Sequence, residues 1–186
     1  KQVAYSASFD GVIVEFIGQD PTFMNTDEKE AYAATQNIVL NAVKSWKSAN
    51  ENKMLTWQGK PQNLIDKTIL NDCSHIILDI DKVTDTNQLL LTVKIALADG
   101  VPTDNIVIAV STTGADTSDK KTGYWDTDVR ALGEVAHWVA AGYPEADGFT
   151  RAGIAIYNVQ NDYYATGGTY TYVKEAINIL NPAPTK

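Results

Sequence analysis

Five stretches of the chain are rich in apolar residues, and each is followed by a segment with helical spacing. Short, nearly continuous apolar runs are typical of parallel strands that are covered on both faces. The predicted strands are residues 11–16, 54–57, 75–80, 106–110 and 153–157. The pattern therefore predicts an α/β fold in which strands and helices alternate along one parallel sheet.

Helix signals lie between and after these strands. The polar run from Thr26 to Lys29 predicts the start of a long helix that continues to about residue 48. The apolar positions with helical spacing predict its buried face, which consists of Ala31, Ala34, Ile38, Ala42 and Val43. The other predicted helices are residues 61–70, 86–98, 126–141 and 169–180.

No repeat or linker interrupts this alternation, so residues 1–186 are predicted to form a single domain. Two architectures fit five parallel units. An open doubly wound sheet predicts a glycine-rich phosphate loop after the first strand, but Asp20 and Pro21 stand there. A (β/α)₈ barrel needs about 250 residues, so the chain would supply only part of one.

Composition narrows the classes of function. The chain of 186 residues has a net charge of −8 and a pI of about 4.6. It has no basic cluster, which disfavours binding to nucleic acid. No apolar run reaches the roughly 20 residues that a membrane-spanning helix needs. The single cysteine, Cys73, is expected to be a buried core residue, because no base stands near it in the sequence.

Residues 9–17 read Phe-Asp-Gly-Val-Ile-Val-Glu-Phe-Ile. This stretch resembles the fourth barrel strand of family 18 glycoside hydrolases, in the endo-β-N-acetylglucosaminidase branch, where the pattern is Asp-Gly-x-Asp-x-Asp-x-Glu. Residues 100–110 and 151–158 look like the approach to that family's seventh strand and its eighth strand. The resemblance implies a TIM (β/α)₈ barrel, of which this chain supplies strands 4–8 with their helices. It also implies that three β/α units precede the segment.

The resemblance implies a substrate-assisted reaction, in which the acetamido carbonyl of the sugar attacks the anomeric carbon. A glutamic acid at the strand end protonates the leaving oxygen, and an aspartate two residues earlier orients the acetamido group. Asp10 matches the family pattern, whereas Ile13, Glu15 and Ile17 stand at its three inner acids. Alternation puts these three positions on one face of the strand. Because isoleucine has no proton to give, the resemblance implies loss of general acid catalysis, which typically contributes 10²–10⁴-fold.

A second part of the family's apparatus is altered. The family places a tyrosine at the end of the sixth strand, where this chain has Asp79 and Asp81. These two acids and Asp85 have a spacing that resembles a calcium loop, but the glycine and final glutamate of an EF-hand are missing. We therefore expect neither a metal ion nor a cofactor.

Side chains at or just beyond the strand ends are expected to bind sugar. Aromatic faces stack on pyranose rings, and carboxylates and amides form hydrogen bonds with hydroxyl groups. The predicted carbohydrate-binding residues are Glu15, Phe16, Trp57, Gln58, Asp79, Asp81, Tyr124, Trp125, Tyr157 and Asn158. Tyr163 and Tyr164 extend this set, unless residues 161–164 form only the turn that leaves the last strand.

Three hypotheses remain open at this point. The first is a glycan-binding protein that has lost catalysis, whose partner is an oligosaccharide containing N-acetylglucosamine. The resemblance implies a location at the cell surface or in the periplasm. The second is an active endo-β-N-acetylglucosaminidase or chitinase-like hydrolase. The third is a five-stranded open α/β domain with an unrelated ligand.

Overall fold

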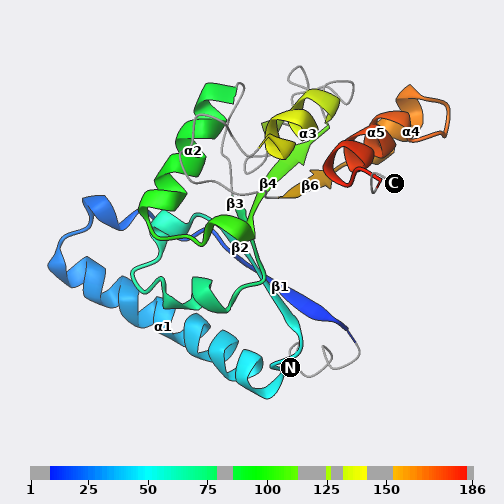
Figure 1. Ribbon diagram of the computed structural model, residues 1–186. Coiled ribbons are helices and arrows are strands. Elements are labelled where there is room, and N and C mark those ends of the chain that lie inside the picture. The colour runs from blue at the N-terminus through cyan, green and yellow to red at the C-terminus, as the bar shows by residue number, and fades with distance from the viewer. Residues whose placement is uncertain (1–8, 79–85, 113–124, 127–131, 142–152, 184–186) are drawn as a thin grey trace.

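The computed structural model describes residues 9–78, 86–112, 125–126, 132–141 and 153–183 (Figure 1). The strands are β1 (Gly11–Phe16), β2 (Met54–Gly59), β3 (His75–Leu78), β4 (Ile106–Ser111), β5 (Trp125–Asp126) and β6 (Gly153–Tyr157). The helices are α1 (Thr26–Ala49), α2 (Thr86–Ala98), α3 (Leu132–Ala140), α4 (Gln160–Ala165) and α5 (Thr171–Leu180). Short 3₁₀ helices are η2 (Pro21–Phe23), η3 (Pro61–Asn63), η4 (Thr68–Asp72) and η5 (Thr103–Asn105). A strand forms at each of the five predicted places.

Every strand pairing described is parallel, and the strands follow one another in sequence order. The order is β1-β2-β3-β4, and both β5 and β6 pair with β4. β5 pairs only with the last two residues of β4, whereas β6 runs along most of it. A doubly wound sheet reverses its strand order at a switch point. The described part of this sheet has no such reversal.

The main core lies between the sheet and the helices. The buried side chains of α1, α2, α3 and α5 pack in one cluster with alternate residues of the strands, among them Leu55, Ile76 and Ile108. Figure 1 shows these helices arranged around the strands that run through the middle of the molecule. One cluster shared by all four helices means that they cover the same face of the sheet. The opposite face, which we call the open face, carries a small apolar cluster around Ile77, Val107 and Ala109.

The long helix forms where it was predicted, but the predicted buried face is wrong except for Val43. Its buried residues are Gln36, Leu40, Val43 and Trp46. Ile38 is 74% exposed, and Ala31, Ala34 and Ala42 are exposed as well. An alanine gains little from burial, whereas Leu40 and Trp46 remove much more apolar area from water. The larger side chains therefore decide which face meets the sheet.

The predicted helix over residues 61–70 is also wrong, because η3 and η4 replace it. The Asp66 carboxylate accepts a hydrogen bond from the Thr68 amide at 2.9 Å, a local turn that competes with a helix. The predicted helix over residues 169–180 starts later than expected, at Thr171. Of the predicted helix over residues 126–141, Asp126 belongs to β5 and Leu132–Ala140 form α3, and residues 127–131 lie outside the described part of the chain. Residues 161–164 belong to the helix α4 and are not merely a turn.

Candidate functional site

Parallel strands end at one edge of their sheet, so the carboxyl ends of β1, β2, β3, β4 and β6 lie together there. We call this the strand-end edge. Neighbouring residues in parallel strands share a face, and the register pairs Glu15 with Gln58 and Gln58 with Ile77. Ile77 belongs to the apolar cluster of the open face. Glu15 and Gln58 therefore lie on the open face, near the strand-end edge.

The predicted alternation along β1 is confirmed. Val12, Val14 and Phe16 pack against the core beneath the helices. Ile13 is 63% exposed, Ile17 is 45% exposed, and Glu15 is exposed as well. Ile13 and Glu15, two of the three positions that correspond to the inner acids of the sugar-cleaving pattern, therefore share the open face, and the third, Ile17, is exposed directly after the strand. Asp10, which precedes them, is exposed at the start of the strand, and its carbonyl accepts a hydrogen bond from the Met54 amide at 2.9 Å.

Tyr157 joins this group from the far side of the sheet. Its hydroxyl donates a hydrogen bond to the side-chain carbonyl of Gln58 at 3.1 Å. β6 and β2 are separated by β3 and β4, which in a flat sheet would place them about 14 Å apart at about 4.8 Å per strand. Side chains stand roughly perpendicular to a sheet. The contact therefore requires a sheet that curls toward its open face. It joins the phenol of Tyr157 to the side-chain amide of Gln58, which is the register neighbour of Glu15.

Phe16 and Trp57 do not join them, and the burial of Trp57 is not compatible with its predicted role as a sugar-stacking residue. Trp57 is 0% exposed and lies in the core beneath the helices, where Phe16 also packs. Their ring centroids are 5.7 Å apart, with a tilt of 50°. Successive residues of a strand point to opposite faces of the sheet. Because Glu15 and Gln58 lie on the open face, Phe16 and Trp57 lie on the face that the helices cover. The ring of Trp57 is enclosed by protein and offers no face to a ligand, whereas that of Phe16 is partly buried.

Asn158 directly follows β6 and adopts a left-handed backbone conformation with φ of 60°. Its carbonyl accepts a hydrogen bond from the Thr112 hydroxyl at 2.7 Å, which ties the ends of β6 and β4 together. The remaining predicted residues cannot be placed in this site. Asp79, Asp81 and Tyr124 lie outside the described residues, and so does the side chain of Trp125.

A buried polar network, which the sequence pattern did not reveal, fixes the backbone beside Ile17. The side-chain amide of Asn63 donates to the backbone carbonyl of Ile17 at 2.7 Å. The backbone carbonyl of Asn63 accepts in turn from the side-chain amide of Gln36 at 2.7 Å and from the Tyr32 hydroxyl at 3.2 Å. Gln36 and Asn63 are only 1% and 4% exposed. The network therefore holds the chain that leaves β1 against α1 and against the loop after β2.

Two carboxylates close to Ile17 in the sequence are engaged in local turns. The Asp20 side chain accepts a hydrogen bond from the Thr22 amide at 2.8 Å, and hydrogen bonds from Thr22 lower the pKa of Asp20. The Glu28 carboxylate accepts from the Asn25 amide at 2.9 Å in a capping box at the start of α1. A general acid needs a pKa that is raised toward the working pH. The shift of Asp20 goes in the opposite direction.

Cys73 is buried, as expected. Its thiol donates to the Ile69 carbonyl at 3.4 Å, and burial raises the pKa of Cys73 to about 12. A thiol with so high a pKa is a poor nucleophile. Among the described side chains, no three His, Cys, Asp or Glu residues are grouped as they would be around a metal ion. None of the described helices is long and apolar enough to cross a bilayer.

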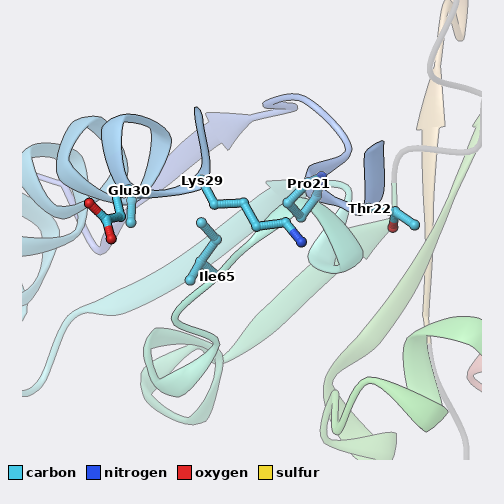
Figure 2. A pocket seen from close by; sticks show the side chains of 6 residues that line it. Pro21, Thr22, Lys29, Glu30 and Ile65 are labelled. Carbon is cyan, nitrogen blue, oxygen red and sulfur yellow. The ribbon is translucent and has the colours of Figure 1, made fainter. Parts of the chain in front are cut away.

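A shallow hollow of about 510 Å³ lies outside the open face, between η2, α1 and Ile65. Figure 2 shows the Lys29 side chain extended toward Pro21, whereas the Glu30 carboxylate points away from it. The lining residues are Pro21, Thr22, Lys29, Glu30, Ala33 and Ile65. None of the predicted site residues lines this hollow, and its charged groups do not converge on one point.

Comparison with known families gives one match. The family described as glycoside hydrolase family 18, BT1044-like, matches residues 3–179, which is nearly the whole chain. Among curated proteins, none matches the chain.

Proposed function

Because this chain belongs to glycoside hydrolase family 18, BT1044-like, we propose that its open face binds a glycan that contains N-acetylglucosamine and does not cleave it. The observation that carries the proposal is the side chain at the end of β1. Ile17, which is 45% exposed directly after β1, stands two residues beyond Glu15, where the resembling pattern has its proton donor. An aliphatic side chain cannot protonate a leaving oxygen, and that step typically contributes 10²–10⁴-fold to the rate.

The groups that remain suit binding. Glu15 supplies a carboxylate, Gln58 an amide and Tyr157 a phenol, and the last two are connected by a hydrogen bond of 3.1 Å. Carboxylates, amides and phenols form hydrogen bonds with sugar hydroxyls and with an acetamido group. Glu15 carries the same charge as the aspartate that orients the acetamido group in the resembling pattern, on a side chain one methylene longer. We expect this group to retain contact with the ligand.

We further propose that the sheet is the arc of a (β/α)₈ barrel that comprises its strands 4–8. Three features support this proposal. The described strands follow in sequence order, the four long helices pack in one cluster on one face, and the Tyr157–Gln58 contact requires a concave open face. A closed barrel would also cover the exposed apolar side chains of Ile13 and Met54, which are 63% and 47% exposed on the open face.

The experiment that tests the function measures binding and turnover on the same sample. Isothermal titration with chitohexaose, a hexamer of N-acetylglucosamine, should give saturable binding. A p-nitrophenyl chitobioside reporter should give no release above the rate without protein. Gln58→Ala should weaken the binding by about tenfold, because it removes an amide from the open face, whereas Ile38→Ala on the outer surface of α1 should leave it unchanged. Turnover of the reporter would favour an active hydrolase, and the absence of any binding would refute the proposal.

A further inference from the structure

Three tyrosines gather on the connection that follows β6. Tyr163 and Tyr164 lie on α4, and Tyr170 directly precedes α5. The ring centroids of Tyr163 and Tyr164 are 5.7 Å apart, and those of Tyr163 and Tyr170 are 5.6 Å apart. Their residues are 47%, 76% and 36% exposed, in the order Tyr163, Tyr164, Tyr170. We call this group the tyrosine ledge, and exposed apolar surface that is contiguous is a feature of binding sites.

A buried carboxylate sets the orientation of the ledge. Asp162 is 0% exposed, and its side chain accepts a hydrogen bond from the Val173 amide in the first turn of α5 at 2.7 Å. This bond supplies the helix cap that Tyr170 does not provide with its own side chain. Because Asp162 points inward to cap α5, the two residues that follow it turn outward. The exposure of Tyr163 and Tyr164 is therefore a consequence of how α4 is anchored.

The turn between the two helices also shapes the ledge. Tyr170 has a φ of 51°, in the left-handed region that residues other than glycine seldom adopt. Gly168 has a φ of 95°, and a Cβ added there would lie 3.2 Å from the ring of Tyr163. The glycine thus allows the backbone to support one ring closely, while the unusual conformation of Tyr170 places the second ring beside it. Such backbone strain is concentrated at functional sites.

A shallow hollow adjoins the ledge in the chain. Thr169 and Thr171, the two neighbours of Tyr170, line a hollow of about 600 Å³ together with Lys174 and other residues of α5. The two threonine hydroxyls are 2.7 Å apart. Hydroxyl and ammonium groups next to aromatic rings match a pyranose, which has an apolar face of C–H groups and a rim of hydroxyls.

The ledge belongs to the same edge of the sheet as the open face. It follows the carboxyl end of β6, and Tyr157 in that strand contacts Gln58. Figure 1 shows α4 and α5 together just beyond β6. A glycan of several sugars that starts on the open face can therefore leave it across this edge.

We propose that the tyrosine ledge stacks on the apolar face of a pyranose ring that lies further along the glycan held by the open face. This inference rests on the proposed function and adds a second contact for the same ligand. Tyr164 is the main stacking residue because it is the most exposed of the three. The hydroxyls of Thr169 and Thr171 and the ammonium of Lys174 then contact the sugar rim.

The test is the titration of the whole chain and its variants with chitohexaose. Tyr164→Ala should weaken binding by about five- to tenfold, because it removes the stacking ring. Tyr164→Phe keeps the ring and should stay within about twofold of the unmodified protein. Ile177→Ala, a change at a side chain of α5 that is 50% exposed, serves as the matched control and should have no effect.

Each outcome decides one question. If the unmodified protein binds chitohexaose and Tyr164→Ala binds it equally well, the ledge is not part of the site and the proposed function stands. Equal losses in the Ile177→Ala control would also overturn the inference, because they would reflect a general disturbance of α5. If neither the unmodified protein nor any variant binds the sugar, the proposed function is wrong and the inference about the ledge is wrong with it. A ledge that instead captures a protein segment would show unchanged sugar binding in Tyr164→Ala.

Discussion

Trp57 and Gln58 are neighbours in β2 that face opposite sides of the sheet, so replacing each by alanine should produce opposite results. Trp57 is 0% exposed in the core beneath the helices, and its ring lies 5.7 Å from that of Phe16. Gln58 is half-buried on the open face and accepts a hydrogen bond from Tyr157. We expect Trp57→Ala to reduce stability and Gln58→Ala to reduce glycan binding.

The magnitude for Trp57→Ala follows from its burial. A buried aromatic side chain removes roughly 150–250 Å² from water, which at about 25 cal/mol per Å² corresponds to about 4–6 kcal/mol. Truncation of a buried tryptophan typically lowers the free energy of unfolding by about 3–5 kcal/mol. For a chain of this size each kcal/mol shifts the melting temperature by about 2–4 °C. The melting temperature should therefore fall by roughly 6–20 °C.

Gln58→Ala removes one hydrogen bond near the surface, so it should lower the free energy of unfolding by only about 0.5–1.5 kcal/mol. Circular dichroism during thermal and urea unfolding measures both stabilities, and titration with chitohexaose below the melting temperature measures both affinities. A Trp57→Ala variant that unfolds within about 1 kcal/mol of the unmodified protein would contradict the burial of this ring, because that loss is too small for a buried tryptophan. Loss of sugar affinity in the folded Trp57→Ala variant would contradict its position away from the ligand.

Three further predictions test other parts of the account. Ile17→Glu should not by itself create turnover of a chitobioside reporter, because the new acid does not supply the tyrosine that the family pattern places on the sixth strand. Substantial product release would show that the remaining groups suffice. Gly59→Ala should strongly destabilise the pairing of β1 with β2, since a Cβ there would lie 2.0 Å from the Phe16 carbonyl oxygen. A Cβ at Gly100 meets nothing within 4 Å, so Gly100→Ala should lower the free energy of unfolding by only about 1–2 kcal/mol, through its positive φ. Equal unfolding curves for the two variants would contradict this. Hydrogen bonds from Thr68 and Lys44 lower the pKa of Asp66 from 3.8 to about 2, so the contribution of Asp66 to stability is present above pH 3.8 and disappears as the pH falls through 2. Asp66→Asn should lower the free energy of unfolding by under about 1 kcal/mol at neutral pH, because the carboxylate is partly exposed. A difference in stability that persists at pH 1.5 would argue against this assignment.

The strands were predictable from sequence because each consists of apolar residues that need cover on one or both faces. β4 is the clearest case, since Ile106–Val110 are all buried. The family could also be predicted, from nine residues around β1, and the match over residues 3–179 supports it. The assignment to an endo-β-N-acetylglucosaminidase branch stays a prediction.

The buried face of α1 could not be predicted from apolar spacing alone. Two faces of the helix carry apolar residues, and the choice depends on which side chains bury more area once the sheet is in place. Gln36 reads as a surface residue in the sequence. Gln36 is only 1% exposed because its side chain forms two hydrogen bonds in the interior. Its side-chain amide donates to the Asn63 carbonyl at 2.7 Å, and its side-chain carbonyl accepts from the Ile65 backbone amide at 2.9 Å. Those partners lie far away in the sequence.

The error at Trp57 has a different origin, because the sequence held the information to avoid it. The alternation that turns Glu15 toward the open face turns Phe16 toward the helices, and the same rule separates Gln58 from Trp57. Collecting every residue at a strand end ignores this rule. The tyrosine ledge, in contrast, depends on the inward direction of Asp162 and on the turn at Gly168, which only the folded chain reveals.

A crystal structure of the protein with chitohexaose bound would test the central claim most directly. We expect an intact oligosaccharide across Glu15, Gln58 and Tyr157, with the aliphatic side chain of Ile17 facing the glycosidic oxygen that a family 18 hydrolase would protonate. A carboxyl group within hydrogen-bonding distance of that oxygen, about 2.6–3.2 Å, or a cleaved sugar in the site would contradict the account.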